Sequence, residues 1–282
     1  MKRKILIPTD FSKNAWFALK YATRLYADEA CDFYLLNVFS ASQNLVGSLF
    51  TMVKGSEPYE TAKATSEKKL NEVIDLVCAS DTENSNHTFH PIAMFNDTIE
   101  AVKEVVDKKD IEIVVMGTKG ETNSPDAVYG STAIYAMEKV RNCPVLAVPE
   151  NAPSELPKEI VFPTDYQTSF KRKELVYLTD IAKKCDANIA VLHVSNHTLN
   201  KEQQEQQQLL KEIFQENAYS LHQLHSSAVN DSIGIFIESR NSDMIAFINT
   251  KHSFFGSVFT NPLVKEVTFL NVPVLALHDL RN

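Results

Sequence analysis

Residues 111–140 read IEIVVMGTKGETNSPDAVYGSTAIYAMEKV and hold the most informative pattern in this 282-residue chain. The apolar start of this segment predicts a buried strand, and its end predicts a helix. The chain has only seven glycines, and three of them, Gly117, Gly120 and Gly130, lie between these two elements. A strand, a glycine-bearing loop and a helix N-terminus bring unpaired backbone N–H groups and the positive end of a helix dipole together. The pattern predicts a phosphate site; the alternative is a loop whose glycines only shape turns.

The composition argues against several classes of protein. With 44% hydrophobic and 23% charged residues, the chain is typical of a globular protein. A formal net charge of −8 argues against a nucleic-acid partner, because no basic excess is present to displace counterions from a phosphate backbone. The apolar runs are too short to cross a bilayer, and the first residues, MKRK, lead into a strand rather than a signal peptide. We therefore expect no nucleic-acid or membrane partner and a cytoplasmic location.

The four cysteines, Cys31, Cys78, Cys143 and Cys185, are scattered and form no C-x-x-C pair. This spacing does not suit a metal site or a redox pair. We expect them to be buried thiols in a reducing compartment.

The chain resembles itself. The segment ILIPTDF at 5–11 returns as IVFPTDY at 160–166, and PVLA at 144–147 returns at 273–276. The interval between the copies shrinks along the chain, so the second copy is a shortened version of the first. This predicts two tandem domains, 1–150 and 158–282, joined by a short proline-containing linker.

Within the first copy, apolar strands alternate with amphipathic helices, which favours an α/β fold with a parallel sheet covered on both faces. We expect two tandem doubly wound parallel five-stranded sheets flanked by helices. In such sheets ligands bind at the carboxyl ends of the strands, where Asp10, Val38 and the glycine loop lie. The strands of the first copy are expected at 4–9, 33–39, 88–94, 111–116 and 144–148; the helices are expected from Ser12, up to about Ala79, from Asp97 and over 131–140.

These residues resemble the universal stress protein family, and the resemblance extends over both copies. It implies a five-stranded sheet with strand order 3-2-1-4-5 in each domain. ATP-binding members of that family share the pattern Gly-x2-Gly-x9-Gly-Ser/Thr, which Gly117, Gly120, Gly130 and Ser131 match without a gap. The resemblance therefore implies an ATP-binding protein of the stress response that acts through nucleotide-dependent conformation or assembly.

The family pattern also implies roles for single residues. Asp10 would hydrogen-bond the ribose or the base edge, although it could equally cap a helix. The backbone of Val38 would contact the adenine edge, and Lys119 would either reach a phosphate or remain a surface lysine. The implied nucleotide contacts are Pro8, Thr9, Asp10, Val38, Met116, Gly117, Lys119, Gly120, Gly130, Ser131 and Thr132.

No catalytic or metal-ligating residue is predicted. No Gly-Lys-Ser/Thr sequence follows the glycines, and the eight histidines form no triad and no metal spacing. We expect at most slow hydrolysis of ATP, with Mg²⁺ as an optional companion of the triphosphate. Two alternatives stay open: an interaction scaffold with structural nucleotide or none, and an adenylating enzyme. The second lacks a glycine-rich first loop, because PTDFS stands there at 8–12.

The second copy departs from the pattern. Matched by its letters, INTKH at 248–252 stands for MGTKG at 116–120, so both glycines have gained side chains. Asp165 and Val194 remain, and we expect a retained fold with a lost site. The apolar strands at 145–148 and 274–277 are expected to pair across a pseudo-two-fold axis. Whether the chain forms a further homodimer is left open.

Overall fold

The computed structural model describes residues 2–39, 53–80, 86–120, 129–153, 155–167, 169–249 and 272–278. Strands and helices alternate through most of this part of the chain. In order they are β1 Arg3–Pro8, α1 Lys13–Leu25, β2 Cys31–Phe39, α2 Glu57–Ser80, β3 His87–Phe95, α3 Thr98–Lys109, β4 Ile113–Gly117, α4 Ser131–Lys139, β5 Val145–Val148, β6 Glu159–Pro163, α5 Arg172–Cys185, β7 Asn188–Val194, α6 Lys201–Ile213, β8 Tyr219–Leu224, α7 Val229–Arg240, β9 Met244–Asn249 and β10 Val274–His278.

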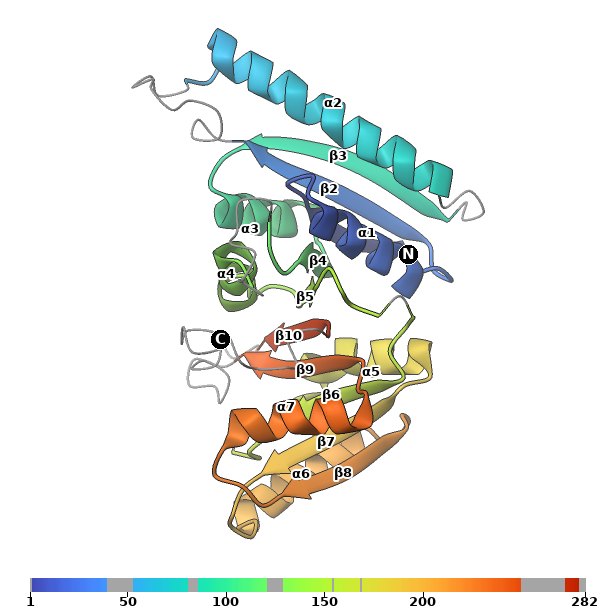
Figure 1. Cartoon of the computed structure of the whole chain (residues 1–282), viewed down its shortest axis with the longest axis vertical. Helices are drawn as coiled ribbons and strands as arrows, with labels where there is room; N and C mark the ends of the chain where they lie inside the picture. The colour runs from blue at the N-terminus through green and yellow to red at the C-terminus, as the bar shows by residue number, and fades with distance from the viewer. Residues whose placement is uncertain are drawn as a thin grey trace.

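The strands form one ten-stranded sheet in the order β3-β2-β1-β4-β5-β10-β9-β6-β7-β8 (Figure 1). Each half, β1–β5 or β6–β10, has the expected order 3-2-1-4-5. The two five-stranded sheets are continuous, because the strands expected to pair, β5 and β10, do so in antiparallel fashion, with Leu146 opposite Leu275. Both strands are fully buried, so neither is left as an apolar edge open to water.

Helices cover both faces of the sheet (Figure 1). Residues of α1, α2, α5 and α6 pack with one set of strand side chains, and residues of α3, α4 and α7 pack with the other. Each of these two core layers contains residues of both halves. This arrangement agrees with the near-continuous apolar strands of the sequence, since a strand buried on both faces does not alternate apolar with polar residues.

The start of α1 shows how the sequence sets an element boundary. The hydroxyl of Ser12 accepts a hydrogen bond from the N–H of Ala15 at 3.2 Å, as expected for an N-cap. Beyond it, the predicted apolar face is buried, with Leu19 1% and Ala22 0% exposed. The helix therefore begins where its cap lies and packs through the predicted stripe.

Charged side chains join the two halves on the α1 side. Arg3 in β1 contacts Glu29 at 2.7 Å and reaches Asp180 in α5 at 3.0 Å. Lys184, also in α5, contacts Asp180 at 2.6 Å and pairs with Glu29. Partial burial alone would raise the pKa of Glu29, but the hydrogen bonds from Lys184 and Arg3 lower it below its ordinary value. Two cations and two anions thus alternate across the junction between the halves.

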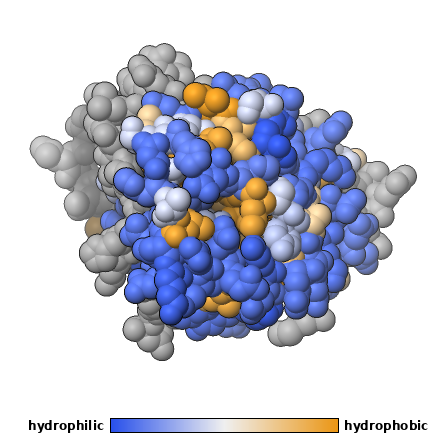
Figure 2. All heavy atoms as spheres, turned by 90° about the horizontal axis from the view of Figure 1, so that it is seen from below, coloured by the Kyte–Doolittle hydropathy of each residue, from blue (hydrophilic) through white to orange (hydrophobic). Residues whose placement is uncertain are grey.

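The surface seen from the β8 and α6 end is mainly hydrophilic, with hydrophobic patches near its middle (Figure 2). Within the described ranges, no helix has the length and apolar character needed to span a membrane.

Three of the cysteines are buried as predicted, but Cys78 is exposed. The prediction for Cys78 is wrong because its neighbour Val77 occupies the buried face of α2 and the helical turn carries Cys78 to the solvent side.

Candidate functional site

The predicted site lies where the strand order reverses. β1 pairs with β2 on one side and with β4 on the other, so the chain leaves in opposite directions from the carboxyl ends of β1 and β4. Asp10 lies two residues after the end of β1, and Gly117 ends β4. The structure therefore brings these two segments, more than a hundred positions apart in the chain, to the edge at which doubly wound sheets bind ligands.

The turn after β1 is held by its own side chains. The Thr9 hydroxyl accepts a hydrogen bond from the N–H of Phe11 at 3.0 Å, and Asp10 Oδ1 accepts one from the N–H of Ser12 at 3.0 Å. Phe11 has a φ of 68°, a left-handed conformation that is rare for an aromatic residue. Strained backbone of this kind is concentrated at functional sites.

The same turn occurs after β6 in the second half. Tyr166 has a φ of 56°, and its N–H donates to the Thr164 hydroxyl at 3.0 Å. Asp165 Oδ1 accepts a hydrogen bond from the N–H of Gln167 at 2.8 Å. Asp10 and Asp165 therefore have the same local role in the turn. The alternative that Asp10 caps a helix is wrong, because Ser12 is the N-cap of α1 and Asp10 Oδ1 bonds the turn before it.

Gly120 lies against Asp10. A Cβ placed on Gly120 would lie 2.5 Å from Asp10 Oδ2, so a larger residue here would require the Asp10 carboxylate to shift from its present position. Gly120 does not have a positive φ, so the backbone conformation does not require glycine, and the approach of the Asp10 carboxylate favours it. The loop backbone and the Asp10 carboxylate are thus in contact at the carboxyl edge of the sheet.

Gly117 is glycine for another reason. A Cβ there would lie 2.7 Å from Oδ1 of Asn14, a buried residue near the start of α1. Asn14 Nδ2 donates to the carbonyl of Val148 at 2.9 Å, and its Oδ1 accepts the N–H of Lys119 at 2.9 Å. The expectation that Gly117 makes room for a phosphate thus has a rival explanation in the structure, which is that Gly117 makes room for Asn14.

Asn14 is absent from the predicted site, although it joins α1, the glycine loop and the end of β5. Its position four residues after Asp10, at the buried start of a helix, is the signal that could have identified it. A buried amide must find partners for its donors and its acceptor, and at the edge of a sheet those partners are loop backbone groups.

Among the residues that the structure describes, no side chain caps the N-terminus of α4. Gly130 is its N-cap residue, and the first turn contains no acidic side chain. The N–H of Gly130 donates to the carbonyl of Thr118 at 2.7 Å, so this group is engaged within the protein. The next N–H groups, those of Ser131 and Thr132, begin the helix and have no intrahelical acceptor, and both residues are exposed. These groups can accept an anion.

The predicted base-contacting residues share one face of the sheet with α4. Met116 is buried in the core layer that contains α4, and Val38 packs against the same layer. Pro8 ends β1 and is buried, with its Cα opposite Leu36 of β2. Every predicted contact lies within the described ranges; residues 121–128, which include Glu121 and Asp126, lie outside them.

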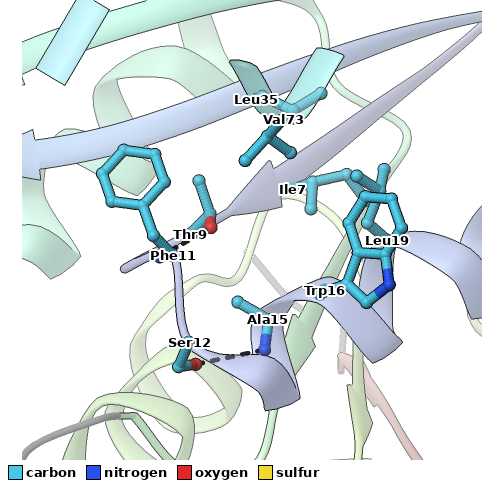
Figure 3. Close-up of a pocket in the computed structure, with 9 residues that line it drawn as sticks. All are labelled: Ile7, Thr9, Phe11, Ser12, Ala15, Trp16, Leu19, Leu35 and Val73. Atoms are coloured by element: carbon cyan, nitrogen blue, oxygen red, sulfur yellow. Dashed lines mark hydrogen bonds between the residues drawn. The ribbon is translucent and has the colours of Figure 1, made fainter. Parts of the chain in front are cut away.

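A small cavity lies beneath the turn after β1, between α1 and α2 (Figure 3). Its volume is about 20 Å³, enough for one water molecule but not for a nucleotide. Its lining is mainly apolar, and Thr9 is the one predicted site residue that belongs to it. The cavity is therefore separate from the glycine loop.

Strand register corrects the match between the two copies by one position. Leu6 and Val161 are equivalent in the repeat; Leu6 pairs with Val114, and Val161 pairs with Ile245, so Val114 and Ile245 are equivalent too. Three residues further on, Ile248 stands in the place of Gly117, and Asn249 follows in the place of Thr118. The shared letters Thr-Lys shifted the match by one residue. Gly117 is still replaced by a larger residue, whereas the counterpart of Gly120 lies outside the described residues.

Val194, at the end of β7, is the counterpart of Val38, which lies near the end of β2. In the position before it, the second half has His193 where the first half has Asn37. Asn37 Nδ2 donates to the carbonyl of Thr9 at 2.7 Å, and His193 Nδ1 donates to that of Thr164 at 2.8 Å. His193 is 4% exposed, as expected for a core residue.

Among the residues that the structure describes, no group of three or more His, Cys, Asp or Glu could hold a metal ion.

Sequence comparison gives the family of this fold. The model of the universal stress protein family matches residues 1–149. The chain belongs to the universal stress protein family. The universal stress protein MJ0577 of Methanocaldococcus jannaschii is 26% identical over 155 residues, which cover 52% of this chain and 95% of that protein.

Solved structures cover both halves of this universal stress protein. One from Archaeoglobus fulgidus is 16% identical with a TM-score of 0.68, and the match covers 97% of this chain and 95% of that one. The protein PA1789 of Pseudomonas aeruginosa, described as functionally unknown, is 12% identical with a TM-score of 0.61, covering 98% and 92% of the two chains. At these identities the likeness extends to the fold alone.

Proposed function

We propose that this universal stress protein binds one ATP molecule at the carboxyl edge of its first half and acts in the stress response through nucleotide-dependent conformation or assembly. The observation that carries the proposal is the meeting of three elements at one place. Asp10 lies in the turn after β1, Gly120 lies against its carboxylate, and the N-terminus of α4 follows Gly130. A carboxylate can accept hydrogen bonds from ribose hydroxyls, and a closely approaching loop backbone with free N–H groups at a helix N-terminus can bind phosphates.

The triphosphate would take its hydrogen bonds from particular groups. The N–H groups of Gly130 and Lys119 already have protein acceptors, so the donors would be those of Ser131 and Thr132, with the hydroxyls of both. The base would lie on the α4 face, near Val38 and Met116. Mg²⁺ would offset the charge of the triphosphate in a protein with a net charge of −8.

The wider proposal concerns the whole chain. Residues 1–150 form the nucleotide-binding domain, and 158–282 form a shortened domain that keeps the fold without the site. The halves act as an intramolecular pseudo-dimer, a proposal supported by the antiparallel pairing of β5 with β10. The location is cytoplasmic, and no catalytic residue is assigned.

Paired aspartate variants test the site. Asp10→Ala should weaken ATP binding about tenfold to a hundredfold, because a charge-assisted hydrogen bond contributes about 1.5–3 kcal/mol. Asp165→Ala removes the matching turn bond in the second half, so it controls for a general effect on folding, and it should leave the affinity within about twofold. Calorimetric titration of both variants measures the difference. Equal losses, or none, would remove Asp10 from the site.

Titrations of the wild-type chain with ATP, AMP and adenosine test the phosphate contacts. Loss of the terminal phosphates removes at least one charge-assisted hydrogen bond, so AMP should bind about tenfold more weakly than ATP or worse. Equal affinities would show that only the adenosine end is recognised. Absence of binding by all three would favour the alternative of an interaction scaffold without nucleotide.

A further inference from the structure

The junction between the halves reverses the direction of the second half. Because β10 runs antiparallel to β5, the carboxyl edge of the second half lies at the amino edge of the first. Helix α4 starts at the carboxyl edge, after the glycine loop, and ends before β5 at the amino edge. The end of β9 therefore contacts the C-terminal end of α4, the helix whose N-terminus follows Gly130.

One hydrogen bond makes this meeting specific. Asn249, the last residue of β9, donates through Nδ2 to the carbonyl of Met137 at 2.7 Å. The N–H of Val140, the C-cap residue of α4, donates a hydrogen bond to the carbonyl of Ala136, one residue before Met137. The Met137 carbonyl belongs to the last turn, whose oxygens lack the regular intrahelical donor. Asn249 thus caps α4 from the opposite half of the molecule.

Equivalent positions of the two halves hold the two ends of this helix. The strand register places Asn249 where the first half has Thr118. The carbonyl of Thr118 accepts the N–H of Gly130 at the N-terminal end of α4, at 2.7 Å. The Asn249 amide holds the C-terminal end. The helix has 9 residues, short enough that its order depends on contacts at its ends and along its buried face.

We propose that Asn249 is a positioning residue for the nucleotide site of the first half. By capping the C-terminal end of α4, it fixes the place of the N–H groups of Ser131 and Thr132 at the other end. This rests on the proposed function, and it gives the second half a role in binding despite its altered loop. The affinity for the phosphates should depend on Asn249, whereas the affinity for adenosine should depend on it much less.

The test compares two asparagine variants in the full chain. Asn249→Asp keeps the shape of the side chain but removes the donor and sets a negative charge beside the C-terminus of α4, where the helix dipole disfavours it. Asn217→Asp is the matched control, because Asn217 Nδ2 donates to the carbonyl of Thr179 in α5, within the second half, at 3.0 Å. Asn249→Ala removes the donor without adding charge and serves if the aspartate variant folds poorly.

Calorimetry with ATP and with adenosine, and hydrogen exchange of the α4 amides, are the readouts. We expect Asn249→Asp to weaken ATP binding about three- to tenfold, to change adenosine binding less than twofold, and to speed exchange in α4. Asn217→Asp should change neither. An unchanged ATP affinity in both Asn249 variants, while wild type binds ATP, would overturn the inference alone. If wild type binds no nucleotide, the proposed function fails, and the inference fails with it.

Discussion

At the scale of single residues, the two loop glycines are explained by two different neighbours. Gly120 avoids the Asp10 carboxylate, whereas Gly117 avoids the amide of Asn14. The first contact belongs to the candidate site, and the second belongs to the packing that supports it. A spacing of glycines in the sequence cannot separate these cases, because each depends on a side chain that approaches from another element.

A double-mutant cycle tests the role of Gly117. Gly117→Ala should cost about 1–3 kcal/mol of unfolding free energy, because its Cβ would clash with an Asn14 side chain fixed by two hydrogen bonds. In an Asn14→Ala background the added cost should be much smaller, leaving only the tight contact with the Asn14 backbone at 3.2 Å. Urea denaturation of the four proteins measures the coupling. Additive effects would contradict this explanation of Gly117.

His278 predicts a dependence of stability on pH. It is 5% exposed, and neither ring nitrogen has a hydrogen-bond partner among the described residues. Burial, with a smaller effect of Arg141, lowers its pKa from 6.5 to about 4. Below pH 6.5 the unfolded chain takes up a proton that the folded chain excludes, so stability is complete above that pH and is lost as the pH falls towards 4.

His278→Leu should therefore reduce the acid destabilisation. Between pH 7.5 and 4.5, the fall in unfolding free energy should shrink by about 2–3 kcal/mol relative to wild type. Urea denaturation across this range is the measurement. His197→Gln, at an exposed position, provides the control and should follow the wild-type curve. A His278→Leu curve parallel to wild type would show that His278 titrates normally in the fold.

At the scale of elements, four charged residues bridge the halves: Arg3 in β1 and Glu29 between α1 and β2 face Asp180 and Lys184 in α5. Arg3 and Lys184 share the carboxylates of Glu29 and Asp180, and all four side chains are at least two-thirds buried. Partial burial limits the screening of these pairs by solvent, so they should contribute more than a surface ion pair.

Asp180→Asn tests this contribution. It removes one of the two anions and should lower the unfolding free energy by about 1–2 kcal/mol. Glu100→Gln breaks the exposed pair of Glu100 with Lys103 and should cost less than about 0.5 kcal/mol. Denaturation curves at low salt compare the two variants. Equal losses would mean that the bridging cluster is no stronger than a surface pair.

Much of the element order could be predicted from the sequence, because caps, apolar runs and glycines act locally. Ser12 caps its helix, and α4 begins at Ser131, where the sequence predicts its start. Asn14 was missed because its partners lie on two distant segments, the glycine loop and the end of β5, which no local pattern records. The one-residue error at Asn249 arose because matching letters compete with strand register, which only the neighbouring strands define.

At the scale of the whole molecule, the continuous sheet unites the halves. The β5–β10 pairing buries Leu146 and Leu275 at its centre, and both core layers contain residues of the two halves. The apolar character of each strand could be read from the sequence. That β5 and β10 pair with each other was one prediction among several, because an apolar edge can also be covered by a helix, a loop or another chain. The joint also sets the C-terminal end of α4 against the second half.

The binding stoichiometry of ATP per chain, measured by calorimetry on the intact protein with Mg²⁺ present, tests the central claim most directly. One nucleotide per chain is predicted, because Gly120 and the N-terminus of α4 are present in the first half, whereas the sequence after β9 in the second half, TKHSFF at 250–255, has no glycine. Two equivalent sites per chain would show that the second half still binds ATP. No heat of binding and no bound nucleotide would contradict the account of the site itself.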